Sequence, residues 1–313
     1  MPELAHREAY GKALAEYGAL NPNVVVLDAD TSSSTLTKFF AARFPERFFN
    51  MGIAEPCLVD VSVGLALGGF IPFANAFAAL FTLRAMEQIR TCICYGHTNV
   101  KLAASYAGVS DYKDGPTHHA ITDIALMRAL PGMTVIVPAD AAEIANWVPV
   151  IAEYEGPVYF RLNRAAALPV HKQEPKVKIG KGEVLRPGVD VTIISAGTMT
   201  GRSVAAADKL AAKGIDARVI HMASIKPLDI DLILQAAEET SAIVTAEEHS
   251  IIGGLGGAIA EVLAENRPTP MARVGIRDTF ARTAPDPDSL MDAIGLGVDD
   301  IVKTVQKLLK TSK

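Results

Sequence analysis

Residues 50–77, NMGIAEPCLVDVSVGLALGGFIPFANAF, contain one expected helix and one expected strand, separated by a pair of glycines. The apolar run over Glu55–Leu67 predicts a helix, and the glycines that follow it end the helix before a short apolar strand over Phe70–Ala74. Units of this kind alternate along almost the whole chain. The sequence therefore predicts mainly parallel sheets covered by helices.

The alternation extends in both directions from this segment. In the first half we expect strands over Val24–Asp28, Phe70–Ala74, Val100–Ala104, Thr134–Val137 and Val158–Leu162. The helices expected there are Glu3–Leu20, Glu55–Leu67, Thr82–Tyr95, Asp123–Leu130 and Ala141–Tyr154. In the second half the expected strands are Val191–Ser195, Ala217–His221, Ala242–Thr245 and Met271–Gly275. The expected helices of that half are Gly201–Ala212, Asp229–Glu238, Leu255–Ala264 and Val298–Leu309.

A segment of a different kind separates the two halves. Ala165–Pro187 contains three prolines and little helical periodicity, which is typical of a linker with at most an edge strand. We therefore predict two three-layer α/β/α domains, residues 1–170 and 186–313, joined by a linker over residues 171–185.

Composition narrows the class of protein. A chain of 313 residues that is 50% hydrophobic and 21% charged can bury two cores and is not intrinsically disordered. Its net charge is −5 and it has no block of lysine or arginine, which argues against nucleic-acid binding. Glycine and proline interrupt the longest apolar stretches, so no membrane span is predicted. Cys57, Cys92 and Cys94 form neither a paired framework nor a zinc spacing, which favours a reduced, cytoplasmic protein.

Glu55 is the most informative single residue, because it begins an almost wholly apolar helix. One interpretation is a helix-start carboxylate stabilised by the helix dipole, an effect of about 0.3–1 kcal/mol. The other is a buried acid that exchanges a proton near neutral pH. Composition does not separate the two.

Three segments together resemble a known family. NMGIAEP followed by GLALGGFIPFANAFAALFTLRAMEQIR is similar to the pyrimidine-binding segment of the thiamine diphosphate enzymes of the transketolase family. DGPTHHAITDIALMRALPGMTVIVPAD, residues 114–140, resembles the substrate loop and the helix after it. TAEEHSIIGGLGGAIAEVLAE, residues 245–265, resembles the third domain of the family, so the likeness covers essentially the whole chain.

One part of the family pattern is missing. The half that binds the cofactor's diphosphate carries Gly-Asp-Gly and, downstream, an asparagine that holds magnesium, but Gly-Asp-Gly does not occur in these 313 residues. The resemblance therefore implies the small, C-terminal subunit of a two-subunit transketolase. A larger subunit would hold the diphosphate and Mg²⁺, this chain would have no metal site of its own, and self-association would complete a heterotetramer.

The resemblance also implies roles for residues at the cofactor. Thiamine diphosphate forms an ylid that attacks a ketose carbonyl, so the protein must help to deprotonate the thiazolium carbon. Glu55 matches the residue that hydrogen-bonds the aminopyrimidine ring. Phe77 and Phe81 are the candidates to stack on that ring, although aromatic side chains near a helix start often belong to the core.

Substrate residues follow by the same match. Asp114 would hydrogen-bond a sugar hydroxyl, and His118 would lie near the reacting carbonyl. Arg7, Ser34 and Arg161 match positions that the family uses for a sugar phosphate, and Arg164 is a local substitute for Arg161.

The implied function is transfer of a two-carbon ketol unit from a ketose phosphate to an aldose acceptor. Two alternatives stay open: the beta subunit of a 2-oxo acid dehydrogenase or a deoxyxylulose phosphate synthase-like enzyme, and a non-catalytic partner that retains the fold. GGLGG at residues 253–257 favours a tight strand-to-helix turn over a dinucleotide site. Glu247, Glu248 and His249 are adjacent and point in different directions, so no metal site is predicted there.

Overall fold

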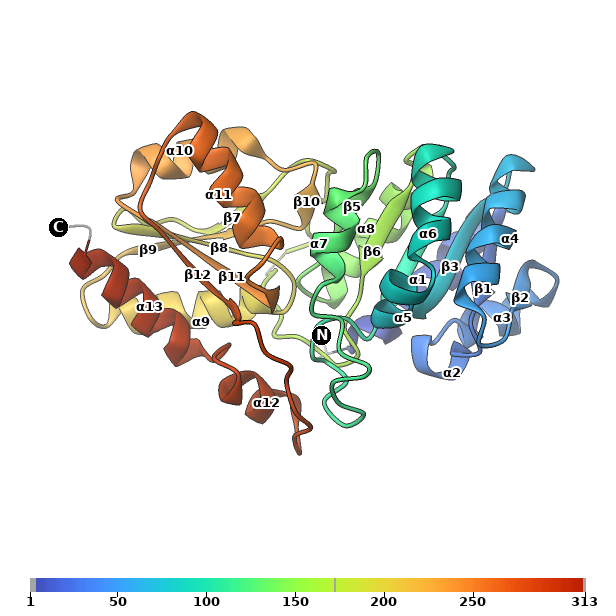
Figure 1. Cartoon of the computed structure of the whole chain (residues 1–313), viewed down its shortest axis with the longest axis horizontal. Coiled ribbons are helices and arrows are strands. Elements are labelled where there is room, and N and C mark those ends of the chain that lie inside the picture. The colour runs from blue at the N-terminus through green and yellow to red at the C-terminus, as the bar shows by residue number, and fades with distance from the viewer. Residues whose placement is uncertain (1–3, 172, 312–313) are drawn as a thin grey trace.

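Each half of the chain folds around one sheet of mainly parallel strands, and the two sheets lie side by side along the long axis (Figure 1). This computed structural model describes residues 4–171 and 173–311. Within that part of the chain, no helix is both long and apolar enough to span a membrane. The expectation of two α/β domains with mainly parallel sheets is confirmed.

The first sheet has the strand order β10-β5-β6-β4-β3-β1-β2, and β10 runs antiparallel to β5 whereas the other pairs are parallel. Its strands are β1 Val24–Asp28, β2 Phe48–Asn50, β3 Ile71–Phe77, β4 Lys101–Ser105, β5 Thr134–Ile136, β6 Val158–Arg161 and β10 Ser224–Lys226. The first-half helices are α1 His6–Leu20, α2 Ser32–Thr35, α3 Lys38–Arg43, the 3₁₀ turn η1 Pro45–Arg47, α4 Glu55–Leu67, α5 Ala78–Arg84, α6 Met86–Gln88, the π-helical segment η2 Ile89–Tyr95, α7 Asp123–Ala129 and α8 Ala141–Glu153.

Successive side chains along each strand point to opposite faces of this sheet, and helices pack on both faces. Val24, Phe73 and Phe160 pack with apolar residues of α1, α3 and α8, including the fully buried Trp147. The alternate residues, such as Val25 and Leu102, pack with α4, α5, η2 and α7 on the opposite face. The period of two along each strand thus produces the three layers.

The second sheet has the order β12-β11-β8-β9-β7, with only the edge pair β7–β9 antiparallel among the described strands. Its strands are β7 Glu183–Arg186, β8 Val191–Ser195, β9 Ala217–His221, β11 Ile243–Ser250 and β12 Met271–Ile276. Helices α9 Met199–Ala211, α12 Pro287–Ala293 and α13 Val298–Thr311 cover one face, and α10 Ile230–Glu239 and α11 Leu255–Asn266 cover the other.

The two domains share structure that the sequence patterns do not predict. β10 falls within the second half of the chain, yet Ser224 pairs with Ile136 in the first sheet. β7 Glu183–Arg186, by contrast, lies in the segment Ala165–Pro187, for which the sequence predicts at most an edge strand, and it forms an edge of the second sheet. One apolar cluster also runs through both domains, with Met127 and Val135 packed in the same core as Ile194 and Leu255.

Asp140 ties the segment after the first domain back onto that domain. One carboxylate oxygen accepts the backbone N–H of Glu143 at 2.9 Å and caps α8, while the other accepts the N–H of Val170 and bonds the His171 ring at 2.9 Å. Burial opposes ionisation of Asp140, but these bonds outweigh it and hold the pKa of the carboxyl below its usual range. Burial alone would lower the pKa of His171, and the hydrogen bond and charge of Asp140 overcome it and raise that pKa.

Replacing His171 with glutamine should therefore cost more stability in acid than in base. The raised pKa of the folded state means that the His171 contribution is complete below about pH 6.5 and is lost as the pH rises through that raised value. We expect H171Q to lose about 1 kcal/mol more unfolding free energy at pH 5.5 than at pH 9, as measured by urea titration. Glu183→Gln removes the half-exposed second partner of the same ring and is the control, with an expected effect below about 0.5 kcal/mol. Equal losses for H171Q at both pH values would contradict this account.

Candidate active site

The carboxyl ends of the parallel strands in the first sheet meet at one edge. The last residues of β1, β3, β4 and β6 are Asp28, Phe77, Ser105 and Arg161, and the loop that contains Asp114 and His118 follows β4. Ligand sites in sheets of this type lie outside the carboxyl ends of the strands. This edge is therefore where the predicted site residues can meet.

Glu55 is the first residue of α4 and only 2% exposed. Arg84 of α5 donates to both of its carboxylate oxygens through Nη1, at 3.2 and 3.3 Å. The Arg84 side chain is itself 52% exposed, so the buried acid is held by a guanidinium that solvent or a ligand reaches. Charged side chains are seldom buried unless they are paired, and Arg84 supplies the partner for this carboxylate.

Phe77 contacts residues that follow β4. Its ring stacks on Tyr106 at 4.3 Å between centroids and meets the His118 ring edge-on at 6.1 Å. Phe77 is half-buried, whereas Phe81 is fully buried in the core beside α4. Of the two predicted stacking residues, Phe77 is thus the one with an accessible ring.

Tyr106 brings the predicted phosphate ligands to the same place. Arg7 donates from Nη1 to the Tyr106 hydroxyl and to the Ser34 carbonyl oxygen, both at 3.1 Å. The Arg164 guanidinium lies 5.2 Å from the centre of the Tyr106 ring. Tyr106 has φ +60°, a conformation that L-residues other than glycine seldom adopt.

Within the structure described, the buried Nε of the Arg7 guanidinium has no hydrogen-bond partner. Arg164 is held on its other side by Asp111, at 2.6 Å. Burial and the nearby Asp114 carboxylate raise the pKa of Asp111 despite this ion pair. The result is a pair of arginines around one tyrosine ring.

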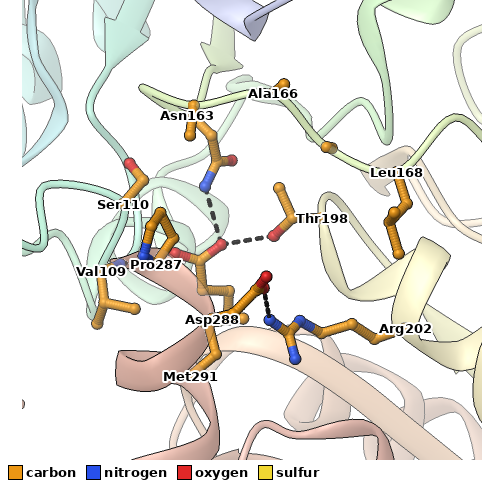
Figure 2. Close-up of a pocket in the computed structure, with 13 residues that line it drawn as sticks. Val109, Ser110, Asn163, Ala166, Leu168, Thr198, Arg202, Pro287, Asp288 and Met291 are labelled. Carbon is orange, nitrogen blue, oxygen red and sulfur yellow. Dashed lines mark hydrogen bonds and ion pairs between the residues drawn. The ribbon is translucent and has the colours of Figure 1, made fainter. Parts of the chain in front are cut away.

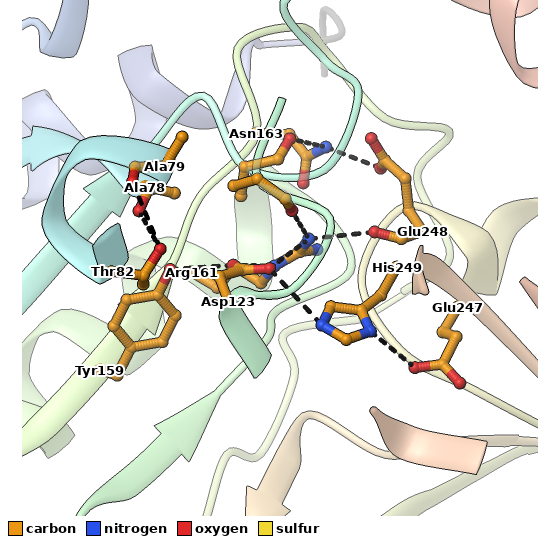
Figure 3. Close-up of polar contacts among 12 residues, drawn as sticks. Ala78, Ala79, Thr82, Asp123, Tyr159, Arg161, Asn163, Glu247, Glu248 and His249 are labelled. Carbon is orange, nitrogen blue, oxygen red and sulfur yellow. Dashed lines mark hydrogen bonds and ion pairs between the residues drawn. The ribbon is translucent and has the colours of Figure 1, made fainter. Parts of the chain in front are cut away.

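Arg161 does not join this group. Its guanidinium is buried and bonds Asp123 through Nε at 2.6 Å and through Nη2 at 3.1 Å, and Tyr159 donates to the same carboxylate (Figure 3). The sequence match assigned Arg161 to the substrate phosphate, but this ion pair occupies it. Arg164, three residues on, lies beside Tyr106 instead.

The remaining loop residues differ in exposure. Asp114 is exposed at the tip of the loop, and His118 bonds the neighbouring Thr117 hydroxyl through Nδ1 at 3.0 Å. His119 is buried against the Asp111 carbonyl oxygen, and burial lowers its pKa. The sequence analysis does not single out Tyr106, Asp111 or Arg84. Tyr106, for example, follows an apolar strand and so has the pattern of a core residue.

The Glu247–His249 segment has structural partners. Glu247 accepts the backbone N–H groups of Leu255 and Gly256 at the start of α11, and burial raises its pKa to about 7. A Cβ on Gly254 would lie 2.0 Å from the Glu247 carboxylate, which confirms the predicted tight turn with close packing. Nε2 of His249 lies 3.9 Å from Oδ1 of Asp123. Across residues 4–171 and 173–311, no cluster of three or more potential ligands could hold a metal ion.

Comparison with known proteins decides the family. The model for the transketolase pyrimidine-binding domain matches residues 2–168, and the model for the transketolase C-terminal domain matches residues 180–301. The chain belongs to the transketolase family. The resemblance found in its sequence is thereby confirmed.

Relatives within the transketolase family include both short and long chains. A protein of Methanocaldococcus jannaschii described as a transketolase C-terminal section is 42% identical over 97% of this chain and 96% of its own length. A solved structure described as a split-gene transketolase, inactive β4 tetramer, is 51% identical and covers 99% of this chain and 100% of its own, with a TM-score of 0.92. The 1-deoxy-D-xylulose-5-phosphate synthase 1 of Geobacter sulfurreducens is 38% identical over 93% of this chain, but the match spans only 45% of that longer enzyme.

Proposed function

We propose that this chain is the small subunit of a two-subunit transketolase, which transfers a two-carbon ketol unit from a ketose phosphate to an aldose acceptor. The observation that carries the proposal is the grouping of Phe77, His118 and Tyr106 at the same sheet edge as the buried Glu55, in a chain without Gly-Asp-Gly. Such a chain has one half of a thiamine diphosphate site. The split-gene relative, which matches this chain over 100% of its own length, supports a second chain as the source of the other half.

The residues present fit the pyrimidine end of thiamine diphosphate. When bound, the cofactor supplies a carbanion that adds to the ketose carbonyl. Glu55 would hydrogen-bond the aminopyrimidine ring and hold a proton there, and its exposed partner Arg84 would give way to the ligand. Phe77 would stack on the ring from its accessible side. The diphosphate and Mg²⁺ would be held by the partner subunit.

The substrate would lie between the loop and the arginine pair. His118 and Asp114 would contact the sugar's carbonyl and hydroxyl oxygens, since both are on the loop and His118 touches Phe77. Arg7, Ser34 and Arg164 would bind the phosphate. The Tyr106 hydroxyl accepts from Arg7, which leaves its own hydrogen to donate to an anionic oxygen.

Helix α4 supports the proposed partner. It is almost wholly apolar, yet it buries only Glu55, Leu58, Val59 and Ser62. A helix that is apolar all round normally has partners on every side. Large apolar side chains are exposed on α4 itself and beside it in the chain, and also on α5 and η2, which both contact α4: Val61, Leu67, Ile53, Phe70, Leu83 and Tyr95.

We assign this apolar face to the large subunit, because α4 begins at Glu55 and the missing half of the cofactor site must reach that residue. An exposed apolar patch of this kind marks an interaction surface. Self-association of the small subunit would complete a heterotetramer, and the β4 relative shows that a similar chain forms a tetramer in the absence of a second type of chain.

Glu55→Gln should abolish turnover without unfolding the protein. An amide cannot hold and release the proton, and general acid–base groups contribute about 10²-fold or more to rate. We expect ketol transfer by the complex with the large subunit to fall by at least that factor, while the circular dichroism spectrum stays that of the unsubstituted protein. Glu261→Gln, which removes an exposed partner of Arg128, is the control. Full activity of E55Q would exclude a catalytic role for Glu55 and favour the non-catalytic alternative.

Arg7→Met should separate binding of the phosphate from the chemistry. Loss of a charge-assisted contact predicts a rise of about tenfold or more in KM for the ketose phosphate, with kcat/KM for the unphosphorylated ketose nearly unchanged. Steady-state assays of both substrates on the reconstituted complex measure this. Arg186→Met, which removes a guanidinium from the edge strand β7, is the matched control. An equal loss for both substrates would rule out a phosphate-specific role.

A further inference from the structure

The substrate loop is held at its base by a residue of the second domain. We propose that Glu248, at the end of β11, is a positioning residue that fixes residues 108–120 so that Asp114 and His118 face the substrate. This inference rests on the proposed function for its kinetic consequence. The contacts that carry it are independent of any reaction.

The Glu248 carboxylate receives three hydrogen bonds and is only 4% exposed. Val109 of the loop donates its backbone N–H to Oε1 at 2.7 Å. Asn163, after β6, donates to Oε2 at 2.8 Å, and Thr198, before α9, donates to the same oxygen at 2.6 Å. The three donors come from the loop, the first domain and the second domain, around a cavity of about 190 Å³ (Figure 2).

Gly108 makes this close approach possible. It has φ +62°, and a Cβ at this position would lie 2.2 Å from Oε1 of Glu248. Gly108 and Ala120 also exchange two backbone hydrogen bonds, at 3.1 and 2.9 Å, which close the loop at its base. Glu248 therefore contacts the base of the loop, where Gly108 and Ala120 are hydrogen-bonded to each other.

The backbone around Glu248 holds the other end of the loop. Arg161 donates from Nη2 to the carbonyl oxygens of both Ala120 and Glu248, at 3.2 and 3.0 Å (Figure 3). The N–H of Ser250 donates to the Ile121 carbonyl oxygen at 2.8 Å. The loop is thus anchored to β11 at its start through a side chain and at its end through the main chain.

The first residues of the loop also pack against the second domain. Val109 lies in the same apolar cluster as Val244 and Val274, and Ala284 donates its N–H to the Tyr112 carbonyl oxygen at 3.0 Å. The second domain therefore packs against the loop and supports it. Asp114 and His118 occupy the side of the loop that is left accessible.

Both carboxyl oxygens of Glu248 are essential to this arrangement. One donor approaches Oε1 and two approach Oε2, so both atoms must be hydrogen-bond acceptors. Glutamine has the same shape, but its amide nitrogen can only donate, so at least one of the three donors would face another donor. Glu248→Gln is therefore a conservative substitution that breaks the clamp without creating a cavity.

Hydrogen exchange of the full-length chain tests the clamp directly. In E248Q we expect the backbone amides of residues 108–120 to exchange about tenfold faster or more, the scale of one lost hydrogen bond to a charged group. Glu247→Gln is the matched control: it changes the adjacent buried carboxylate, whose partners are in α11 and not in the loop. E247Q should leave loop exchange as it is in the unsubstituted protein. Thr198→Val removes one donor and should give a smaller increase than E248Q.

Kinetics of the complex with the large subunit separate positioning from folding. E248Q should lower kcat/KM for the ketose by about tenfold or more through a higher KM, while half-saturation by thiamine diphosphate stays unchanged, because Glu248 touches the loop and not Glu55 or Phe77. E247Q should leave both quantities unchanged. Loop exchange in E248Q equal to that in E247Q, or an unchanged KM, would overturn the proposal. Absence of ketol transfer by the unsubstituted complex would refute the proposed function, and the exchange comparison would still decide the role of Glu248.

Discussion

The geometry of this site depends on the hydrogen bonds of the Arg161 guanidinium. From the end of β6 it binds Asp123 at the start of α7, the Ala120 carbonyl at the end of the substrate loop, and the Glu248 carbonyl of the second domain. Burying a guanidinium is costly unless its hydrogen bonds are satisfied, and removal of one partner of a buried pair costs about 3–5 kcal/mol. Burial opposes the charge of Arg161, but Asp123 outweighs it and raises the pKa of Arg161 above its ordinary range. One charged group thus fixes the relative positions of a sheet edge, a helix, a loop and a second domain.

The arginines near this edge of the sheet differ in how completely protein groups pair with them. Arg161 is fully used inside the protein, whereas Arg7 and Arg164 lie around Tyr106 and stay partly accessible. Glu55 shows a similar contrast, since a buried acid is held by the exposed Arg84. The structural charges are satisfied by protein groups, and the proposed functional groups keep capacity for a ligand. The outer face of α4 is also left without a partner in this chain, because its apolar side chains are exposed; a second chain would cover them.

Much of this fold could be predicted from local sequence, and specific elements show why the rest could not. β1, α4, β8 and β9 match the predicted bounds, because each is an uninterrupted apolar or periodic run ended by glycine, proline or a polar residue. The predicted helix over Thr82–Tyr95 is instead α5, α6 and η2, and α2, β2 and β10 are too short for a periodic pattern. β10 depends on a partner strand almost 90 residues earlier, which local pattern cannot reveal. At the site, motif matching predicts roles for Glu55, Phe77, His118, Arg7 and Ser34, but it could not show that Phe81 is buried in the core or that Arg161 is paired with Asp123.

The central claim is that this chain forms half of a thiamine diphosphate enzyme. Native mass spectrometry of the tagged chain, purified from the cells that make it, tests this claim most directly, because subunit composition and bound cofactor are recorded in one spectrum. The account predicts a complex with a second, larger type of chain, in which thiamine diphosphate and Mg²⁺ are present only when both chains are present. A homo-oligomer that contains no cofactor and recruits no such chain would contradict it.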